Sequence, residues 1–239
     1  MQGPAISQTK QKAVVLLSGG LDSATVLGIA KEAGHECFCL TFDYGQRHHK
    51  EIASAKALAE WAKAPHEIVS FQLPWKGSAL LDEGIRIPKD RSPEKMSEEI
   101  PVTYVPARNT IFLSFASSWA EVVEASLIYF GANAIDYSGY PDCRSGYLLA
   151  FQRMIALGTK RGVQGKSPQI LAPLLHKTKA QIIQWGIRLG VPYELTWSCY
   201  EGKEIPCQQC DSCLLRVKAF QEALVDDPLL KTQPTTFKG

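Results

Sequence analysis

The chain has 239 residues, of which 45% are hydrophobic and 21% charged, a composition typical of a globular protein. Its 26 Lys and Arg residues nearly balance 24 Asp and Glu residues, which argues against a strongly basic nucleic-acid-binding protein. No stretch approaches the roughly 20 apolar residues of a membrane helix, and the polar start at 1–12 lacks the apolar core of a signal peptide. We therefore expect a cytoplasmic protein with no membrane contact and no direct nucleic-acid partner.

The first part of the chain alternates between strand and helix patterns. Apolar runs at 13–17, 36–44 and 66–73 are typical of buried strands, and helical patterns lie between them at 22–34 and 50–64. This alternation predicts a parallel sheet with right-handed crossovers.

Segment 74–101 interrupts the alternation with four prolines, many charges and few apolar residues. We expect a mobile flap or a disordered insertion there. The later predicted helices lie at 108–125, 145–161, 178–189 and 212–225, and the later strands at 126–132 and 169–175.

Together these elements predict an α/β fold, a Rossmann-like doubly wound parallel sheet of about five strands, with a small helical C-terminal region. The expected organisation is a tail at 1–12, an α/β domain at 13–190 and a four-cysteine region with a closing helix at 191–239.

A glycine-rich turn, Leu17-Ser18-Gly19-Gly20-Leu21-Asp22-Ser23, follows the first predicted strand. Doubly wound sheets bind ligands at the carboxyl end of this strand. Two glycines let an anion approach the backbone amides, and the next helix adds a partial positive charge. The alternative is a tight turn with an Asp or Ser cap. Neither the dinucleotide fingerprint nor a Walker loop is present.

Four of the seven cysteines, Cys199, Cys207, Cys210 and Cys213, have the spacing C-x7-C-x2-C-x2-C. In a reducing compartment such a cluster is more often a metal site than a set of disulfides. Four thiolates match a closed, structural zinc site with one ion per chain. An iron–sulfur cluster and a set of buried free cysteines are the alternatives.

The Ser-Gly-Gly-x-Asp-Ser order resembles the PP-loop of the ATP pyrophosphatases, which cleave ATP between the α- and β-phosphates and adenylate an oxygen of their substrate. The resemblance implies that Mg-ATP binds to this turn and the start of the following helix, with Asp22 as a magnesium ligand. Tyr44, which ends the second strand, is expected beside the nucleotide. The expected ATP-binding residues are Leu17, Ser18, Gly19, Gly20, Leu21, Asp22, Ser23, Ala24, Thr25, Val26, Leu27 and Tyr44.

Further segments, at 42–48, 105–109, 131–144 and 196–200, join the loop and the cysteines in resembling the 7-cyano-7-deazaguanine synthases over about 13–224. The resemblance implies conversion of 7-carboxy-7-deazaguanine, ammonia and ATP into a nitrile precursor of queuosine, through an adenylated acid and an amide. A homodimer is the family expectation. The sequence departs from the family at Gln208, where a glycine would ease the turn at the metal.

Free ammonia is the expected nitrogen source. A glutaminase needs a nucleophilic cysteine and a second domain, and the chain has no room for one. Gln2 also excludes an amino-terminal cysteine nucleophile, although a separate glutaminase subunit stays an alternative.

The loop after the fourth predicted strand is assigned to the deazaguanine by the resemblance. Carboxylates there accept from guanine-like N–H groups, aromatic rings stack on the base, and Arg144 holds the substrate carboxylate. A polar surface loop is the alternative. The assigned residues are Asp136, Tyr137, Tyr140, Asp142 and Arg144.

Three further groups complete the expected site. Arg108 and Asn109 begin a helix on the same side and suit a phosphate or carboxylate, and a solvated helix start is the alternative. Lys177 follows the fifth strand and would neutralise departing pyrophosphate, unless it is an ordinary exposed lysine. Asp22, Arg108 and Lys177 are the expected catalytic residues, whereas His48 and His49 are expected to be structural or solvated.

Two other functions fit parts of the sequence. A PP-loop tRNA-thiolating enzyme would use the cysteines for sulfur or an iron–sulfur cluster, but the net charge of +2 argues against an RNA-binding surface. A nucleotide-binding sensor would bind ATP without releasing pyrophosphate.

Overall fold

The computed structural model of the chain describes residues 10–92, 95–96, 100–133 and 140–231. Five parallel strands form one sheet in the order β3-β2-β1-β4-β5. The strands are β1 (Lys12–Leu16), β2 (Glu36–Asp43), β3 (His66–Ser70), β4 (Leu127–Tyr129) and β5 (Gln169–Leu171). The strand order reverses between β1 and β4, which makes the carboxyl ends of these two strands the topological switch point. The predicted α/β, doubly wound sheet is confirmed.

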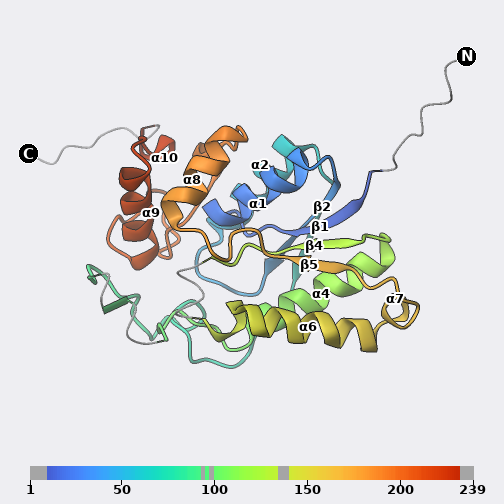
Figure 1. The fold of residues 1–239 in the computed structure, drawn as a ribbon. Coiled ribbons are helices and arrows are strands. Elements are labelled where there is room, and N and C mark those ends of the chain that lie inside the picture. The colour runs from blue at the N-terminus through green and yellow to red at the C-terminus, as the bar shows by residue number, and fades with distance from the viewer. Residues whose placement is uncertain (1–9, 93–94, 97–99, 134–139, 232–239) are drawn as a thin grey trace, which may run out of the picture.

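Helices cover both faces of the sheet, as Figure 1 shows. On one face lie α1 (Leu21–Glu32), α2 (Lys50–Ala62), α8 (Lys179–Arg188) and α9 (Asp211–Glu222), with α10 (Pro228–Lys231) beside α9. On the other face lie α4 (Arg108–Val122), α6 (Ser145–Gly158) and α7 (Lys160–Val163). Short 3₁₀ turns span Pro141–Cys143 (η1) and Tyr193–Leu195 (η2). Across the described ranges, no helix is both long and apolar enough to cross a membrane.

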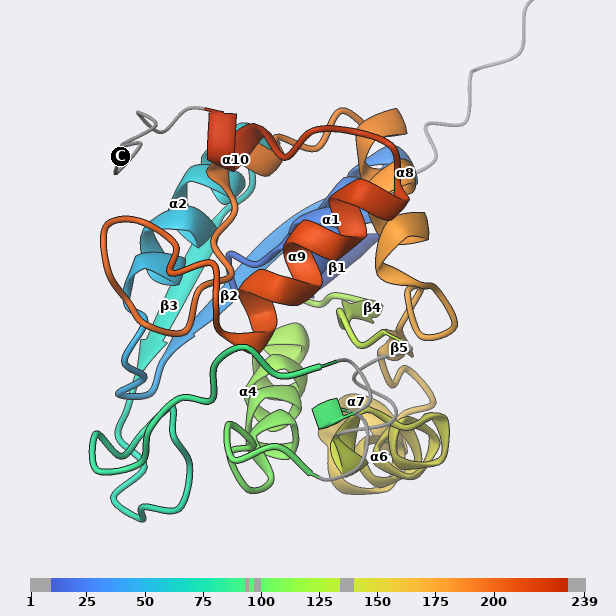
Figure 2. The same ribbon diagram turned by 90° about the vertical axis from the view of Figure 1, so that its left-hand side faces the viewer.

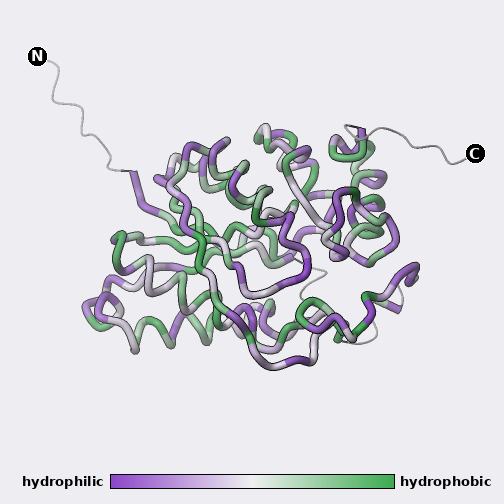
Figure 3. Tube along the Cα trace, turned by 180° about the vertical axis from the view of Figure 1, so that it is seen from behind, coloured by the Kyte–Doolittle hydropathy of each residue, from purple (hydrophilic) through white to green (hydrophobic). Residues whose placement is uncertain are grey.

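The central strand β1 is buried on both faces. Val14 and Leu16 pack with α4 and α6, whereas Ala13, Val15 and Leu17 pack with α1, α2, α8 and α9. Because both faces are covered, the strand is a continuous apolar run rather than an alternating one. Figure 3 shows hydrophobic stretches of the trace gathered where the strands lie between the helix layers.

The helices of the structure differ from the prediction in two places. The helix expected at 145–161 is divided, because Thr159 Oγ1 accepts the Gly162 N–H at 3.0 Å and so caps a new helix, α7. α10 was not predicted, although the sequence carries its start signal. Asp227 Oδ1 accepts the Leu229 N–H at 3.0 Å, and a proline follows that aspartate.

The expected flap at 74–101 is attached to the body of the protein at several points. Ala79 is fully buried, and its N–H donates to Val102 O at 2.8 Å. Farther along, the Asp90 N–H donates to Gln209 O at 2.9 Å, inside the cysteine region. Figure 2 shows the teal and green part of the chain passing close to the start of α9. Mobility of this segment stays a prediction.

Gly186 of α8 leaves no room for a side chain on the face of the sheet that α1 covers. A Cβ at Gly186 would lie 1.8 Å from Tyr193 Oη. That hydroxyl lies 2.8 Å from Thr25 Oγ1 of α1 and donates to Ile182 O at 3.1 Å. The missing side chain at Gly186 therefore lets Tyr193 join α1 to α8.

We expect Gly186→Ala to displace Tyr193 and to lower the free energy of unfolding by about 1–3 kcal/mol. Gly146→Ala, in the first turn of α6, is the matched control, because among the described residues no atom lies within 4 Å of its Cβ. Urea unfolding of both variants measures the difference. Equal stability of the two variants would contradict the packing account.

Candidate functional site

A cleft of about 280 Å³ lies at the switch point. Its floor includes Leu17 and Ser18, which follow β1, and Phe130 and Gly131, which follow β4. α4 and α9 supply walls, and the segment around Trp197 closes one side.

The glycine turn is held against two other segments. Gly19 has φ +85°, and a Cβ there would lie 2.1 Å from Glu51 O in the first turn of α2. Gly19 O accepts the Trp197 N–H at 2.9 Å. Only glycine fits here, because any other residue would be strained at this positive φ and its side chain would collide with α2.

The N-terminus of α1 faces the cleft without a side-chain cap in the described part of the chain. Gly20 is the N-cap residue, and Leu21, Asp22 and Ser23 of the first turn all line the cleft. Ser23 Oγ lies 3.1 Å from Ser18 Oγ and fixes the turn. The uncapped N–H groups and the helix dipole suit an anion.

Asp22 is held in place through one of its carboxylate oxygens. Oδ2 accepts from Lys179 Nζ and from Asn133 Nδ2, the latter at 3.1 Å. Oδ1 is buried and has no hydrogen-bond partner among the described residues. The orphaned oxygen fits a hard cation such as Mg²⁺, which prefers carboxylate and phosphate oxygens.

The lysine that contacts Asp22 is Lys179, which the sequence analysis did not assign to the site. Lys179 lines the cleft and pairs with Asp22, whereas Lys177 is not among the lining residues. Thr178 caps α8 through a capping box with Gln181, so Lys179 is the first residue of the helix. Lys177 belongs to the preceding turn. The sequence showed two neighbouring lysines but not which one the cap would orient.

Arg108 and Tyr44 meet at the α4 wall of the cleft. Arg108 Nη1 donates to Tyr44 Oη at 3.1 Å, and both residues line the cleft. Burial raises the pKa of Tyr44, so the phenol keeps its proton near neutral pH. The arrangement presents a guanidinium and a hydroxyl to a ligand.

The predicted substrate residues are divided by the structure. Tyr140 lines the cleft, but Asp142 and Arg144 do not. Asp142 is buried, and its Oδ2 accepts the Asn109 N–H at 3.1 Å at the start of α4. Arg144 is exposed and precedes α6. Asp136 and Tyr137 lie outside the described residues.

The expected ATP loop is divided in the same way. Leu17, Ser18, Gly20, Leu21, Asp22 and Ser23 line the cleft, whereas Gly19, Ala24, Thr25, Val26 and Leu27 do not. Positions 24–27 are buried in the second turn of α1 and pack against the sheet and α8. Their side chains hold the helix on the body of the protein, and their part in ATP binding stays a prediction.

Several lining or contacting residues were not predicted. Asn133 follows β4 and contacts Asp22, so its place at the carboxyl end of a strand was the available signal. His48 and Glu51 also line the cleft, as do Trp197 and Tyr200. Three of these four lie in the segments at 42–48 and 196–200 that carry the family resemblance, but no local pattern showed that they would meet at one cleft.

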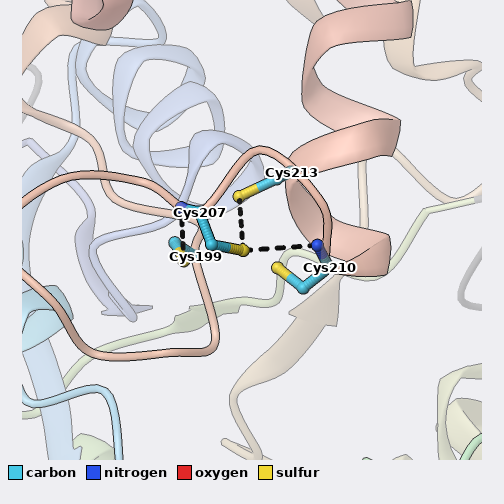
Figure 4. Close-up of side chains that lie close together, drawn as sticks. All are labelled: Cys199, Cys207, Cys210 and Cys213. Carbon is cyan, nitrogen blue, oxygen red and sulfur yellow. Dashed lines mark hydrogen bonds between the residues drawn. The ribbon is translucent and has the colours of Figure 1, made fainter. Parts of the chain in front are cut away.

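The four cysteines of the expected metal site lie together, as Figure 4 shows. Their Sγ atoms all lie within 4.8 Å of one another. Tetrahedral zinc with Zn–S bonds of about 2.3 Å requires sulfur separations of about 3.8 Å, so a small contraction would complete the site. The Cys207 N–H donates to Cys199 Sγ at 3.3 Å, and the Cys210 N–H donates to Cys207 Sγ at 3.3 Å.

The protonation of the cluster also favours a divalent cation. Hydrogen bonds from the Cys210 and Cys213 thiols lower the pKa of Cys199. The same contact with Cys199 raises the pKa of Cys210 to about 12, and the pKa of Cys213 is raised as well. Four thiolates this close together repel one another, and a divalent cation bound between them would offset their charge. Gln208 has φ +58°, the left-handed region where glycine carries less strain.

Comparisons with known proteins give the family. The model of the family described as "Queuosine biosynthesis protein QueC" matches residues 12–224. The chain belongs to this family. A 7-cyano-7-deazaguanine synthase of Trichodesmium erythraeum is 58% identical over 221 residues, 92% of this chain and 100% of the relative. One of Thermoplasma acidophilum is 52% identical over 230 residues, 96% of each chain. The protein is thus an enzyme of the ligase type that this family comprises.

A solved structure supports the fold. The NMN synthetase of Francisella tularensis superposes with a TM-score of 0.50 at 17% sequence identity, covering 98% of this chain and 82% of that one. At this identity the similarity concerns the fold alone.

We expect Cys210→Ser to lower both the zinc content and the midpoint of thermal unfolding, because a hydroxyl replaces one of four thiolates. Cys37→Ala is the matched control, since Cys37 lies in β2 and belongs to a different apolar cluster. Elemental analysis and thermal unfolding measure the two properties. A Cys210→Ser protein with a full complement of zinc would exclude this ligand set.

Proposed function

We propose that the chain converts 7-carboxy-7-deazaguanine and ammonia into 7-cyano-7-deazaguanine at the expense of ATP, as a step of queuosine biosynthesis. One observation carries the proposal. In a single cleft, the uncapped N-terminus of α1 and the orphaned oxygen of Asp22 converge with two cations, Lys179 and Arg108. This is the set of groups that the transfer of a nucleotidyl group to a carboxylate requires.

The proposed chemistry starts from an acid that is a poor acyl donor, because its oxygen is a poor leaving group. A carboxylate oxygen attacks the α-phosphorus of ATP, and the bond from that phosphorus to pyrophosphate breaks. Ammonia then attacks the acyl carbon, and AMP leaves with the C–O electron pair to give an amide. A second adenylation, at the amide oxygen, lets that oxygen leave as AMP and gives the nitrile.

The residues of the cleft have separate roles in this proposal. The amides of 21–23 at the start of α1 hold phosphate oxygens, and Lys179 neutralises the charge that develops on departing pyrophosphate. Asp22 Oδ1 would hold a magnesium ion, which supplies charge neutralisation between the phosphates. Arg108 lies on the cleft wall and is better placed than the exposed Arg144 to bind the substrate carboxylate.

The substrate base is assigned to the residues that surround Tyr140. Tyr140 would stack on the deazaguanine ring. Asp142 Oδ1 is buried without a partner among the described residues, and it keeps the role of accepting from the base that the family resemblance implies. Asp136 and Tyr137 keep the roles that the family resemblance implies.

The four cysteines would hold one structural zinc ion per chain, with no open coordination position. Their cluster packs with Trp197, Ala79 and Leu229, so the ion would fix the cleft wall rather than take part in the reaction. A cytoplasmic location, free ammonia as the nitrogen source and a homodimer stay predictions.

The reaction is tested directly by mass spectrometry of 7-carboxy-7-deazaguanine incubated with the protein, ammonium, magnesium and ATP. We expect a product with the mass of the nitrile, together with AMP and pyrophosphate. If the amide accumulates and no nitrile forms, only the first step of the proposal, amide formation, is supported. Absence of both products, with iron in the protein, would favour tRNA thiolation instead.

Exchanging the two neighbouring lysines tests which one serves the site. We expect Lys179→Met to lower the rate of pyrophosphate release roughly 100-fold or more, because the charge beside Asp22 is lost, and Lys177→Met to stay within about threefold of wild type. Steady-state pyrophosphate assays measure both rates. The reverse order of effects would restore the assignment made from the sequence.

A further inference from the structure

The proposed reaction removes every proton from the incoming nitrogen. Ammonium carries four N–H bonds and the nitrile nitrogen carries none, so several protons must leave near the acyl carbon. A side chain that accepts protons in the cleft is therefore required, and this inference rests on the proposed function.

Among the described lining residues, the side chains with a carboxylate or an imidazole are Asp22, His48 and Glu51. Asp22 already accepts from Lys179 and Asn133 and is the candidate magnesium ligand. The other two are adjacent in space.

His48 and Glu51 form a carboxylate–imidazole pair inside the protein. His48 is 5% exposed, and its Nε2 lies 3.1 Å from Glu51 Oε2. A carboxylate only accepts, so Nε2 carries the shared proton and Nδ1 of the neutral ring has a lone pair. Nδ1 is buried, and no described residue donates to it or accepts from it. The imidazole therefore retains one vacant acceptor.

The carboxylate of this pair is fixed from its other side. Gln46 is fully buried, and its Nε2 donates to Glu51 Oε1 at 3.0 Å and to Phe42 O at 3.0 Å. The Tyr44 N–H donates to Gln46 Oε1 at 2.8 Å. Glu51 is thereby held in one orientation and in turn holds the His48 ring.

The pair stands beside the phosphate-binding turn. A Cβ on Gly19 would touch Glu51 O, so the first turn of α2 abuts the loop. The charged and titratable groups facing the pair are Tyr200, whose ring centroid lies 5.8 Å from that of His48, and Arg108 and Tyr44, which interact electrostatically with Glu51. His48 and Glu51 line the same cleft as the glycine turn, to which the proposed function assigns the acyl adenylate.

We propose that His48, oriented by Glu51 and Gln46, takes the protons released by the nitrogen nucleophile. An N–H bond of ammonium breaks and an H–Nδ1 bond forms. The nitrogen lone pair then attacks the acyl carbon, and the C–O bond to AMP breaks. His48 passes its proton to water before the next transfer. Glu51 and Gln46 are positioning residues, because they act through the imidazole.

The test compares His48→Gln with His49→Gln. Glutamine places an amide N–H near the position of Nε2 and keeps a donor for Glu51, but it cannot accept a proton. His49 is the matched control, because its side chain is 64% exposed and it is not among the lining residues. Two rates are measured for each protein in the presence of 7-carboxy-7-deazaguanine: exchange of labelled pyrophosphate into ATP without ammonium, and amide formation after ammonium is added.

For His48→Gln we expect exchange within about twofold of wild type and amide formation roughly 100-fold slower near neutral pH. The deficit should shrink at alkaline pH, where free ammonia replaces ammonium. Normal exchange also shows that the variant folds and binds ATP.

Two results would overturn the inference alone, and a third would overturn it together with the proposed function. If wild type forms nitrile and both variants form amide equally fast at every pH, His48 has no part in proton transfer. The same follows if His48→Gln loses exchange and amide formation together, because its role is then structural. If wild type forms neither adenylate nor amide, the proposed function fails together with this inference.

Discussion

The close approach of the Gly19 backbone to α2 is the contact on which the site depends. At this position a side-chain carbon would lie 2.1 Å from Glu51 O, so the loop after β1 and the first turn of α2 can touch only because the side chain is missing. The same glycine accepts from the Trp197 N–H, which attaches the cysteine region to the loop. One residue thus joins three segments around the cleft, and the chemistry proposed for each segment requires the others to be in place.

The cysteine region and segment 74–101 act as one support for the cleft wall. Lys89 forms an isolated bridge to Cys210, and Arg91 pairs with Asp211 at the start of α9. Arg216, one turn farther along α9, lines the cleft and forms a buried ion pair with Asp227. A metal ion on the four sulfurs would stiffen this support behind the cleft wall, where Trp197 packs with the cysteines. The core of the fold is large enough without a metal ion. A structural ion would therefore act on the cleft wall rather than on the stability of the core.

Local features of the sequence were sufficient for most of the fold and for part of the site. The apolar run of β1, the glycine turn and the cysteine spacing each encode their structure within a few neighbouring residues, so they could be recognised without tertiary information. The division of the helix at Thr159 was missed because it depends on one capping side chain. The helical pattern of the sequence continues across this position, and it is a stronger signal than a single threonine.

The sequence by itself determined the class of fold, the glycine turn after β1 and the grouping of the four cysteines, because these follow from periodicity, glycine geometry and spacing. Only the tertiary structure decided which distant side chains share the cleft. Lys179 rather than Lys177 meets Asp22, Asp142 supports α4 instead of lining the cleft, and a histidine expected to be structural pairs with Glu51 beside the loop. These outcomes depend on how helix starts from four parts of the chain are oriented at one sheet edge, and no local pattern carries that information.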